Sequence, residues 1–443
     1  MDDALSTLLA REGPLTAPNA AARLNVTPMT INNRAKAAGG RMLILGRGKN
    51  TRYALPNAAL TGQSQWPLYW VAADGDIHEF ATASYAQPNV VHVYGSAINT
   101  QTHGDFPWFL TPLALRGYLG RAARFRLGAV AQQWDTHPEQ WPIAQQVFAA
   151  QSGALEHAGA ILWGDESLRT WQSSNKQTPH RDDPTTLLNI YDELAKSATI
   201  GPIAGSSADG EQPKFSTRVI DANGQVREVL VKFSPQRNTP FGERWHDLLF
   251  AEAIASNVLR DFGFDVPETR VLSSPLRTYL ESARIDRTGA TGRRHLLPLK
   301  AVHSAFTHGS QRHWADTIYK LASQKRIAQT ALATTQTLYA FGQLIGNTDM
   351  HFGNLGVIVE SPEKIAKGHF DLAPCYDMLP MRFKPEAHSD FGYTPFEAEL
   401  SAALPHEVRS TAKAMANEFW RRISDEASVS DYWRDFARGR IER

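Results

Sequence analysis

The stretch that most constrains this chain is the run GNTDMHFGN at residues 346–354, together with Asp377 further along. An apolar helical pattern over residues 329–345 leads into the run, and a short apolar strand, 355–359, leads out of it. A strand-like segment, 368–372, then precedes Asp377. The pattern therefore predicts a helix, a polar turn and a hairpin that ends at a second Asp.

Phosphoryl transfer by a kinase requires this set of groups. One Asp accepts the proton of a substrate hydroxyl, an Asn five residues later binds Mg²⁺, and a second Asp bridges Mg²⁺ to the phosphates. Asp349 and Asn354 have this spacing, and Asp377 is placed to be the second carboxylate. The alternative is a hairpin in which Asn347, Asp349 and Asn354 are ordinary turn formers. The spacing alone is common, but the joined pattern favours the kinase interpretation.

The run from Ile345 to Asn354, with LAPCYD at 372–377, closely resembles the signature of the HipA family. These are bacterial serine/threonine protein kinases that act as toxins of toxin–antitoxin pairs. The resemblance extends, with gaps, from about Trp66 to the C-terminus, so the first sixty residues lie outside the family's usual plan. It implies roles for four residues: Asp349 as the catalytic Asp, His351 as a contact to ATP, and Asn354 and Asp377 as Mg²⁺ ligands.

Length and composition set the outer limits. A chain of 443 residues has room for two to four domains. No apolar run approaches the ~18–20 residues of a membrane span, and the acidic N-terminus lacks the apolar segment of a signal peptide. The single cysteine, Cys375, excludes an internal disulfide framework and argues against a Cys-built metal site. We therefore expect a soluble cytoplasmic protein with no membrane partner.

Residues 1–60 form the basic part of the chain. They hold eight Lys and Arg against three Asp and Glu, a net charge of +5 in a chain whose total is only +1. Three helical patterns are followed by two strands: 3–11, 15–24 and 27–38, then 41–45 and 51–55. This order predicts a winged helix-turn-helix domain, with Thr27 as the cap of its third helix. Residues 56–65 are typical of a linker.

In a winged helix-turn-helix that binds DNA, the third helix enters the major groove and the wing meets phosphate. The residues in those positions are Thr27, Thr30, Asn33 and Arg34 on the helix, and Arg47, Lys49 and Arg52 on the wing. The alternative is a winged helix used for protein contacts or dimerisation, with a solvated basic face.

Residues 66–190 are aromatic and strand-rich, match the N-terminal subdomain of HipA-type kinases in outline, and carry no catalytic pattern. There, Trp108 and Trp163 indicate core or interface positions.

Residues 191–285 have the features of a kinase small lobe. Lys232 lies in an apolar strand, where burying a cation requires an anionic partner. Glu252 falls within the apolar band of a helix over 244–260 and is the candidate partner. Alternatively, Lys232 faces outward from an amphipathic strand.

The resemblance adds the other nucleotide contacts. The run SSADGEQPK at 206–214 is similar to the HipA-family loop over the ATP phosphates, where amides beside Gly210 would hold phosphate. Taken alone, this run would be read as a surface turn with no ligand. The resemblance also implies autophosphorylation of Ser207 and adenine contacts at the backbone of Ala283 and Ile285. The family's usual hinge Glu is replaced by Ala283, which leaves nucleotide selectivity open.

Residues 286–443 are mostly helical and predict a large lobe. We therefore expect an α+β, bilobal protein-kinase-like fold with an N-terminal winged helix-turn-helix. The leading function is an ATP- and Mg²⁺-dependent serine/threonine protein kinase, and the family implies a toxin role and a helix-turn-helix antitoxin partner. Two alternatives stay open: a small-molecule kinase on the same fold, and a DNA-binding transcriptional regulator whose kinase body senses nucleotide.

Overall fold

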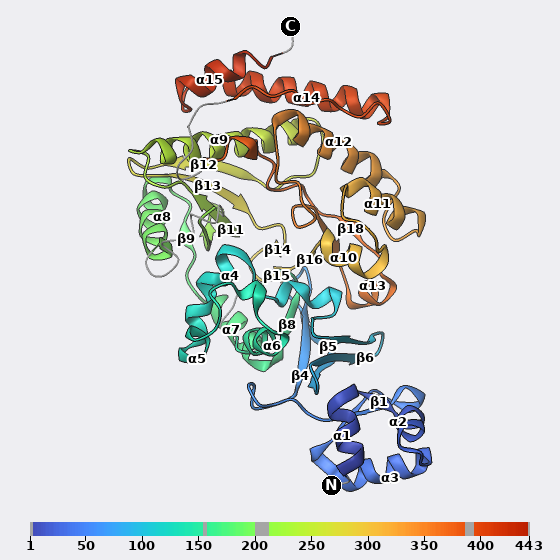
Figure 1. The fold of residues 1–443 in the computed structure, drawn as a ribbon. Coiled ribbons are helices and arrows are strands. Elements are labelled where there is room, and N and C mark those ends of the chain that lie inside the picture. The colour runs from blue at the N-terminus through green and yellow to red at the C-terminus, as the bar shows by residue number, and fades with distance from the viewer. Residues whose placement is uncertain (1–2, 154–156, 200–211, 386–393, 442–443) are drawn as a thin grey trace. The chain divides into compact units, whose positions relative to one another are not determined.

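The computed structural model describes residues 3–153, 157–199, 212–385 and 394–441. The chain divides into two compact units, shown in Figure 1. The N-terminal unit comprises Met1–Gln177 and Glu360–Gly368, and the C-terminal unit comprises Thr178–Val359 and His369–Arg443. In the part of the chain described, none of the helices combines the length and apolar character that crossing a membrane requires.

The N-terminal unit begins with three helices and a three-stranded sheet of order β1-β3-β2. These elements are α1 (Asp3–Glu12), β1 (Leu15–Thr16), α2 (Ala17–Leu24), α3 (Pro28–Ala38), β2 (Leu43–Leu45) and β3 (Arg52–Ala54). Three helices and two strands lie where the sequence predicts them, but the helix expected from residue 15 starts later. Leu15 and Thr16 pair with β3 instead, and the Thr16 hydroxyl caps α2 by accepting from Asn19 N at 3.4 Å.

The hairpin of β2 and β3 also packs against the next sheet of the same unit. Leu43, Leu45 and Ala54 are buried in one cluster with Ala86 and Val90. The segment expected to be a linker is held at its start, because Pro56 forms a bridge with Ala86. The hairpin thus packs on the following sheet, but the two sheets are separate.

That following sheet has five strands in the order β7-β6-β5-β4-β8. Its strands are β4 (Gln65–Val71), β5 (Ile77–Ala86), β6 (Val90–Gly95), β7 (Asn99–His103) and β8 (Ile161–Trp163). The helices of this part are α4 (Gly117–Arg124), α5 (Ala129–Gln132), α6 (Ile143–Gln151), α7 (Gly164–Ser174) and α13 (Pro362–Lys367). Trp163 is fully buried, with its ring 5.6 Å from that of Trp66, so it is a core residue.

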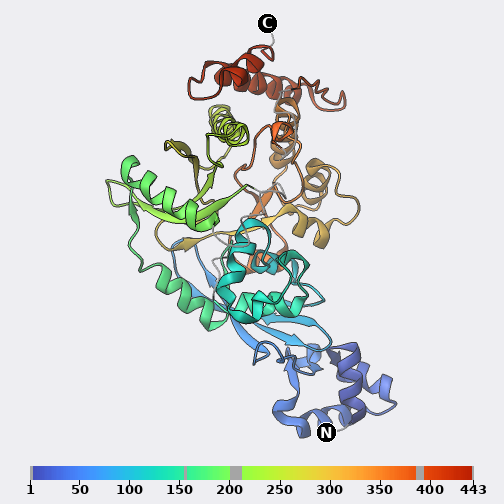
Figure 2. The same cartoon turned by 60° about the vertical axis from the view of Figure 1, so that its left-hand side comes forward.

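The C-terminal unit begins with a five-stranded sheet of order β12-β13-β11-β10-β9 and two helices. These are β9 (His180–Arg181), α8 (Pro184–Thr199), β10 (Lys214–Ile220), β11 (Val226–Phe233), α9 (Pro240–Asp261), β12 (Thr269–Ser273) and β13 (Thr278–Ala283). Alternate residues of β11 face opposite sides of the sheet. Val231 and Phe233 pack with Tyr191 of α8, whereas Lys232 lies opposite Leu280, which packs on α9. The two helices therefore cover opposite faces (Figures 1 and 2).

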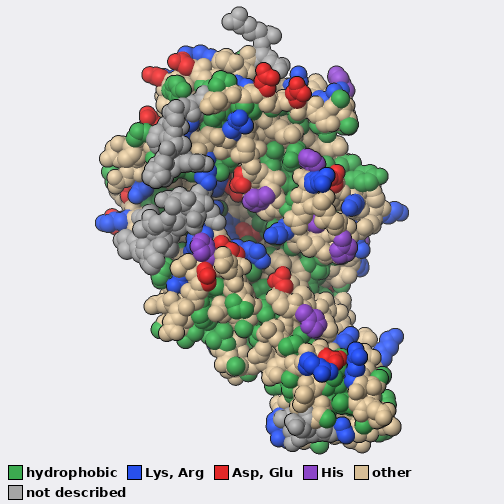
Figure 3. Space-filling model, viewed as in Figure 1, with side chains coloured by type: hydrophobic (Ala, Val, Ile, Leu, Met, Phe, Trp, Pro, Cys, Tyr) green, Lys and Arg blue, Asp and Glu red, His purple; other side chains and the backbone are tan. Residues whose placement is uncertain are grey.

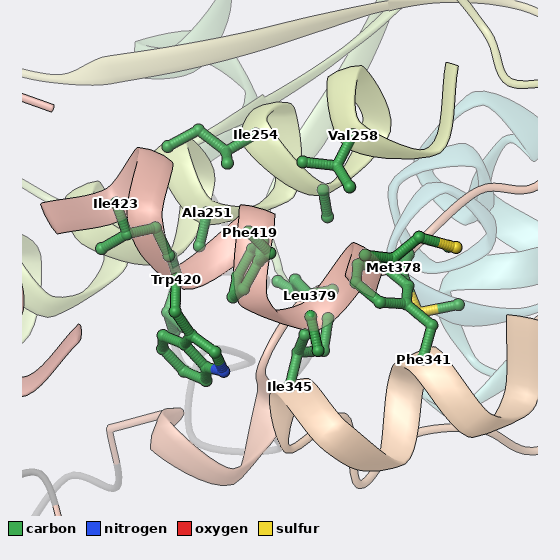
Figure 4. Close-up of a cluster of buried hydrophobic side chains, with 14 of the residues drawn as sticks. Ala251, Ile254, Val258, Phe341, Ile345, Met378, Leu379, Phe419, Trp420 and Ile423 are labelled. Atoms are coloured by element: carbon green, nitrogen blue, oxygen red, sulfur yellow. The ribbon is translucent and has the colours of Figure 1, made fainter. Parts of the chain in front are cut away.

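The rest of this unit is mostly helical. It contains β14 (Arg287–Thr288), β15 (Gly292–Arg293), β16 (His295–Pro298), α10 (Leu299–Phe306), α11 (Trp314–Ser323), α12 (Thr330–Ile345), β17 (Gly356–Val359), β18 (Asp371–Leu372), α14 (His406–Asp425) and α15 (Asp431–Arg438). A large apolar cluster joins α9, α12 and α14, with Phe341 and Ile345 of α12 against Phe419 of α14 (Figure 4). The predicted α+β fold, with a mixed lobe and a helical lobe, is confirmed. The C-terminal end of α12 is held by its apolar contacts with α9 and α14.

Candidate functional site

The polar turn that follows α12 is fixed by hydrogen bonds to its backbone. Gly346 ends the helix in the left-handed conformation, at φ 81°. A Cβ at this position would lie 2.8 Å from the Phe396 ring, so only glycine fits both the conformation and the space. Further on, Trp314 Nε1 donates to His351 O at 3.0 Å, and Lys300 N donates to Phe352 O at 2.9 Å. The turn therefore has one defined shape.

Within the turn, Asp349 and Asn354 contact each other. Asn354 Nδ2 donates to the Asp349 backbone oxygen at 2.8 Å and to its carboxylate Oδ2 at 3.2 Å. The amide oxygen of Asn354 accepts no hydrogen bond from the described residues, so it is free to bind a cation. The Asp349 side chain is 47% exposed, and His351 Nε2 lies 3.7 Å from its other carboxylate oxygen. An exposed carboxylate held from one side can receive a proton from a substrate hydroxyl.

Lys232 brings two carboxylates together. Its Nζ lies 2.5 Å from Glu252 Oε1 and 2.5 Å from Asp377 Oδ1. Glu252, in α9, is the partner that the sequence indicates, and both it and Lys232 are buried. Asp377 follows β18 and joins the same ammonium group. Next to it, the Tyr376 hydroxyl donates to Gly353 O at 3.0 Å, so the Asp377 segment adjoins the polar turn.

Charge and burial set the pKa values of this cluster. Burial opposes the charge of Asp377, but Lys232 and then Lys214 outweigh it, so the pKa of Asp377 is lowered. Burial raises the pKa of Glu252, and Lys232 offsets this only in part. For Lys232 itself, burial favours the neutral amine, but Asp377 and Glu252 outweigh it and raise the pKa. Lys232 is therefore a cation at neutral pH.

Lys214 was not among the predicted site residues. It begins β10 and stands directly opposite Lys232 in the β10–β11 pairing. Its charge lowers the pKa of both Asp377 and Glu252, after the larger effects of burial and Lys232. The signal that could have found it is the register of the hairpin, which places two lysines side by side.

The two predicted hinge residues differ in what their backbone offers. Ala283 N already donates to Glu268 O at 2.8 Å, and Arg284 N donates to Glu228 O at 2.9 Å. Within the described part of the chain, neither the N–H nor the C=O of Ile285 has a hydrogen-bond partner. A hydrogen bond from a backbone N–H to a purine is thus open at Ile285 and closed at Ala283. Gly210 and Ser207 lie outside the described residues.

The predicted DNA-binding residues lie on the helices and hairpin of the N-terminal unit, where Figure 3 shows Lys and Arg side chains. The Thr27 hydroxyl caps α3 by accepting from Thr30 N at 3.2 Å. Four of the seven are exposed and three are half-buried: Thr27, Asn33, Arg47 and Lys49, then Thr30, Arg34 and Arg52. Arg52 lies close enough to His92 for its charge to affect that imidazole. Arg47 and Lys49 are therefore the better-placed wing cations for phosphate.

Comparison with known proteins gives the following matches. The HipA-like C-terminal domain family matches residues 206–437, and the family described as YjjJ-like toxin, middle domain, matches residues 62–172. Toxin YjjJ of Escherichia coli (strain K12) is 33% identical over 444 residues, which cover 99% of this chain and 96% of that protein.

Two solved structures are similar at low sequence identity. The Helicobacter pylori proinflammatory kinase CtkA is 15% identical, with 51% of this chain and 88% of that chain covered and a TM-score of 0.35. The Shewanella oneidensis MR-1 toxin–antitoxin complex of HipA, HipB and operator DNA provides the second. Its matching chain is 14% identical, with 85% and 92% covered and a TM-score of 0.48.

Proposed function

We propose that this chain, which belongs to the HipA-like family, is a kinase that transfers the γ-phosphoryl group of ATP to a Ser or Thr hydroxyl of a protein. The observation that carries the proposal is the contact of Lys232 with both Glu252 and Asp377. A lysine held between a helix carboxylate and a metal-binding carboxylate is the arrangement that kinases use to hold ATP phosphates. The adjoining turn supplies Asp349, exposed to a substrate.

The side chains fit the two groups that the reaction needs. Among the described residues there is no cluster of three or more His, Cys, Asp or Glu that could hold a metal by itself. Mg²⁺ beside a nucleotide needs only one or two protein ligands, because phosphates and water supply the rest. Asn354, with its unpaired amide oxygen, and Asp377, with its ionised carboxylate, would hold this ion. When bound, ATP supplies the phosphoryl group, and Mg²⁺ neutralises its charge.

The chain's own groups have distinct tasks in this proposal. Lys232 would hold phosphate oxygens, and the backbone of Ile285 would hold the adenine. Asp349 would orient the substrate hydroxyl and accept its proton, with the amide of Asn354 fixing the carboxylate. His351 would contact the nucleotide. These tasks are positioning and charge stabilisation, on which phosphoryl transfer mainly depends.

The test is transfer of label from γ-labelled ATP with Mg²⁺ by the purified full-length protein. Phosphoserine or phosphothreonine in protein targets supports the proposal. Label found only in added small hydroxyl compounds would point to a small-molecule kinase. Mg²⁺-dependent ATP binding without transfer to any acceptor would instead point to a regulator that senses nucleotide.

We further propose that the N-terminal module binds duplex DNA through α3 and the wing tip. The support is the +5 charge of residues 1–60 and the exposure of Asn33, Arg47 and Lys49. A toxin role and a small helix-turn-helix antitoxin as partner are proposals that rest on family membership and on the similarity to Toxin YjjJ.

Replacing Arg47 and Lys49 with Ala should weaken DNA binding and make it less sensitive to salt. Each phosphate contact removed lowers the slope of log affinity against log salt by about 0.9. Affinity of the full-length variant and wild type for duplex DNA, measured over a range of salt, checks this. The full chain is used because Leu43, Leu45 and Ala54 of the hairpin are buried with Ala86 and Val90. An unchanged slope would favour the protein-contact function of the module.

Ser207 is expected to become phosphorylated slowly by the kinase itself, which lowers its activity. A phosphoserine adds about −1.5 to −2 charge at pH 7. The family resemblance implies that amides of this loop would receive ATP phosphates, so a phosphoserine there would repel the nucleotide and occupy the same donors. Mass spectrometry after incubation with ATP and Mg²⁺ should find the phosphate on Ser207, or on the adjacent Ser206, and not in an Asp349→Asn variant. An active enzyme with neither serine modified would remove this regulation and leave the kinase proposal standing.

A further inference from the structure

The side chain of Asn347 is buried at the start of the polar turn. Its amide group forms hydrogen bonds with two segments, the polar turn itself and the segment of Asp377. Asn347 is 5% exposed. Its Oδ1 accepts from the backbone N–H of Asp349 at 3.0 Å, and its Nδ2 donates to the backbone oxygen of Asp377 at 3.4 Å. An N–H requires an acceptor and a carbonyl requires a donor, so the amide has only one orientation that satisfies both.

The two partners of this amide are the backbones of the proposed base and the proposed metal ligand. Asn347 and Asp377 are 30 residues apart in the sequence. The same two segments also meet where Tyr376 donates to Gly353 O at 3.0 Å. Asn347 thus connects the segments at the residues that carry the carboxylates. Tyr376, next to Asp377, connects them again at Gly353, the residue before Asn354.

The backbone of Asp377 has a conformation that needs such support. Its φ is 55°, in the left-handed region. A non-glycine residue there is strained and persists only when its surroundings hold it. The hydrogen bond from Asn347 Nδ2 restrains the peptide group that follows this angle. The contact of the same nitrogen with Met378 Sδ, at 3.6 Å, lies on the next residue.

We propose that Asn347 is a positioning residue that sets Asp349 and Asp377 relative to each other, so that metal binding and proton acceptance occur in one geometry. This inference rests on the proposed kinase function. Asn347 touches neither substrate nor metal in this role, and acts through the backbone of the two aspartates. Its loss should therefore raise the Mg²⁺ requirement and lower turnover, while nucleotide contacts that need no metal persist.

The experiment compares Asn347→Ala and Asn347→Asp with wild type in the full-length protein. Asn347→Ala removes both hydrogen bonds. Asn347→Asp is isosteric and keeps an acceptor for Asp349 N–H, but it places an oxygen against the Asp377 carbonyl. Thr348→Ala is the matched control, since Thr348 is the exposed neighbour in the same turn. Three quantities are measured: kcat, the Mg²⁺ concentration that half-saturates nucleotide binding, and the nucleotide Kd in EDTA.

For both Asn347 variants we expect kcat to fall by 10–100-fold and the half-saturating Mg²⁺ concentration to rise by a similar factor, as for other residues that orient metal ligands. The Kd in EDTA should stay within about twofold, which also shows that the variants are folded, and Thr348→Ala should match wild type. Unchanged kcat and Mg²⁺ dependence would overturn the positioning role. So would a nucleotide affinity in EDTA that falls by the same factor as the affinity with Mg²⁺. If wild type transfers no label at all, the kinase proposal fails instead, and the Mg²⁺ dependence of binding still decides the role of Asn347.

Discussion

Asp349→Asn should lose phosphoryl transfer by about 10²–10⁴-fold while keeping its affinity for Mg²⁺ and nucleotide. The amide is isosteric but cannot accept the substrate proton, so only the transition state loses stabilisation. The Asn354 side chain keeps its hydrogen bond to the backbone oxygen of residue 349, so the turn should hold its shape. Single-turnover label transfer and calorimetric nucleotide binding measure the two effects separately.

The control for this variant is Asp316→Asn, which removes an exposed carboxylate from α11 and should change neither quantity. If the toxin proposal holds, expression of wild type should arrest growth, and expression of Asp349→Asn should not. Transfer by Asp349→Asn at the wild-type rate would show that Asp349 is not the base, and the carboxylate would have to be sought elsewhere.

Asp377→Asn should abolish Mg²⁺-dependent nucleotide binding, and turnover with it. The substitution removes a charged metal ligand. Of the two carboxylates that contact Lys232, only that of Glu252 remains. Burial already raises the pKa of Glu252, so this single carboxylate balances the buried cation less well than the pair does. Titration of the nucleotide with and without Mg²⁺ should show that the metal no longer increases affinity.

A second variant separates the metal role from the charge balance. Lys232→Met removes the cation, and in the double variant with Asp377→Asn the two losses should be far from additive, because both residues belong to one cluster. Additive losses would show that Lys232 and Asp377 act independently. A Mg²⁺ response in Asp377→Asn equal to that of wild type would contradict the assignment of Asp377 as a metal ligand.

The sequence by itself determined the local elements and the family. The helix before the polar turn is recognised by its apolar period, and the Thr27 cap is recognised by its residue type. The family is recognised by two short runs around Asp349 and Asp377, and the domain match over 206–437 confirms that resemblance. The pair of Lys232 and Glu252 could also be predicted, because a lysine buried in an apolar strand requires an anionic partner and Glu252 falls within the apolar band of the next helix. Each of these inferences depends on residues near one another in the sequence, or on one strong physical demand.

Only the tertiary structure decided the contacts between distant segments. Lys232 meets Asp377 across 145 residues, and no pattern in the sequence indicates that one ammonium group serves two carboxylates. The same is true of Ala283, whose N–H is taken by Glu268, and of the hairpin of the N-terminal module, which packs on Val90. Such contacts depend on strand register and on how helices and sheets pack. A shift of one residue in register would exchange the buried and exposed faces without altering the local composition from which the elements are predicted.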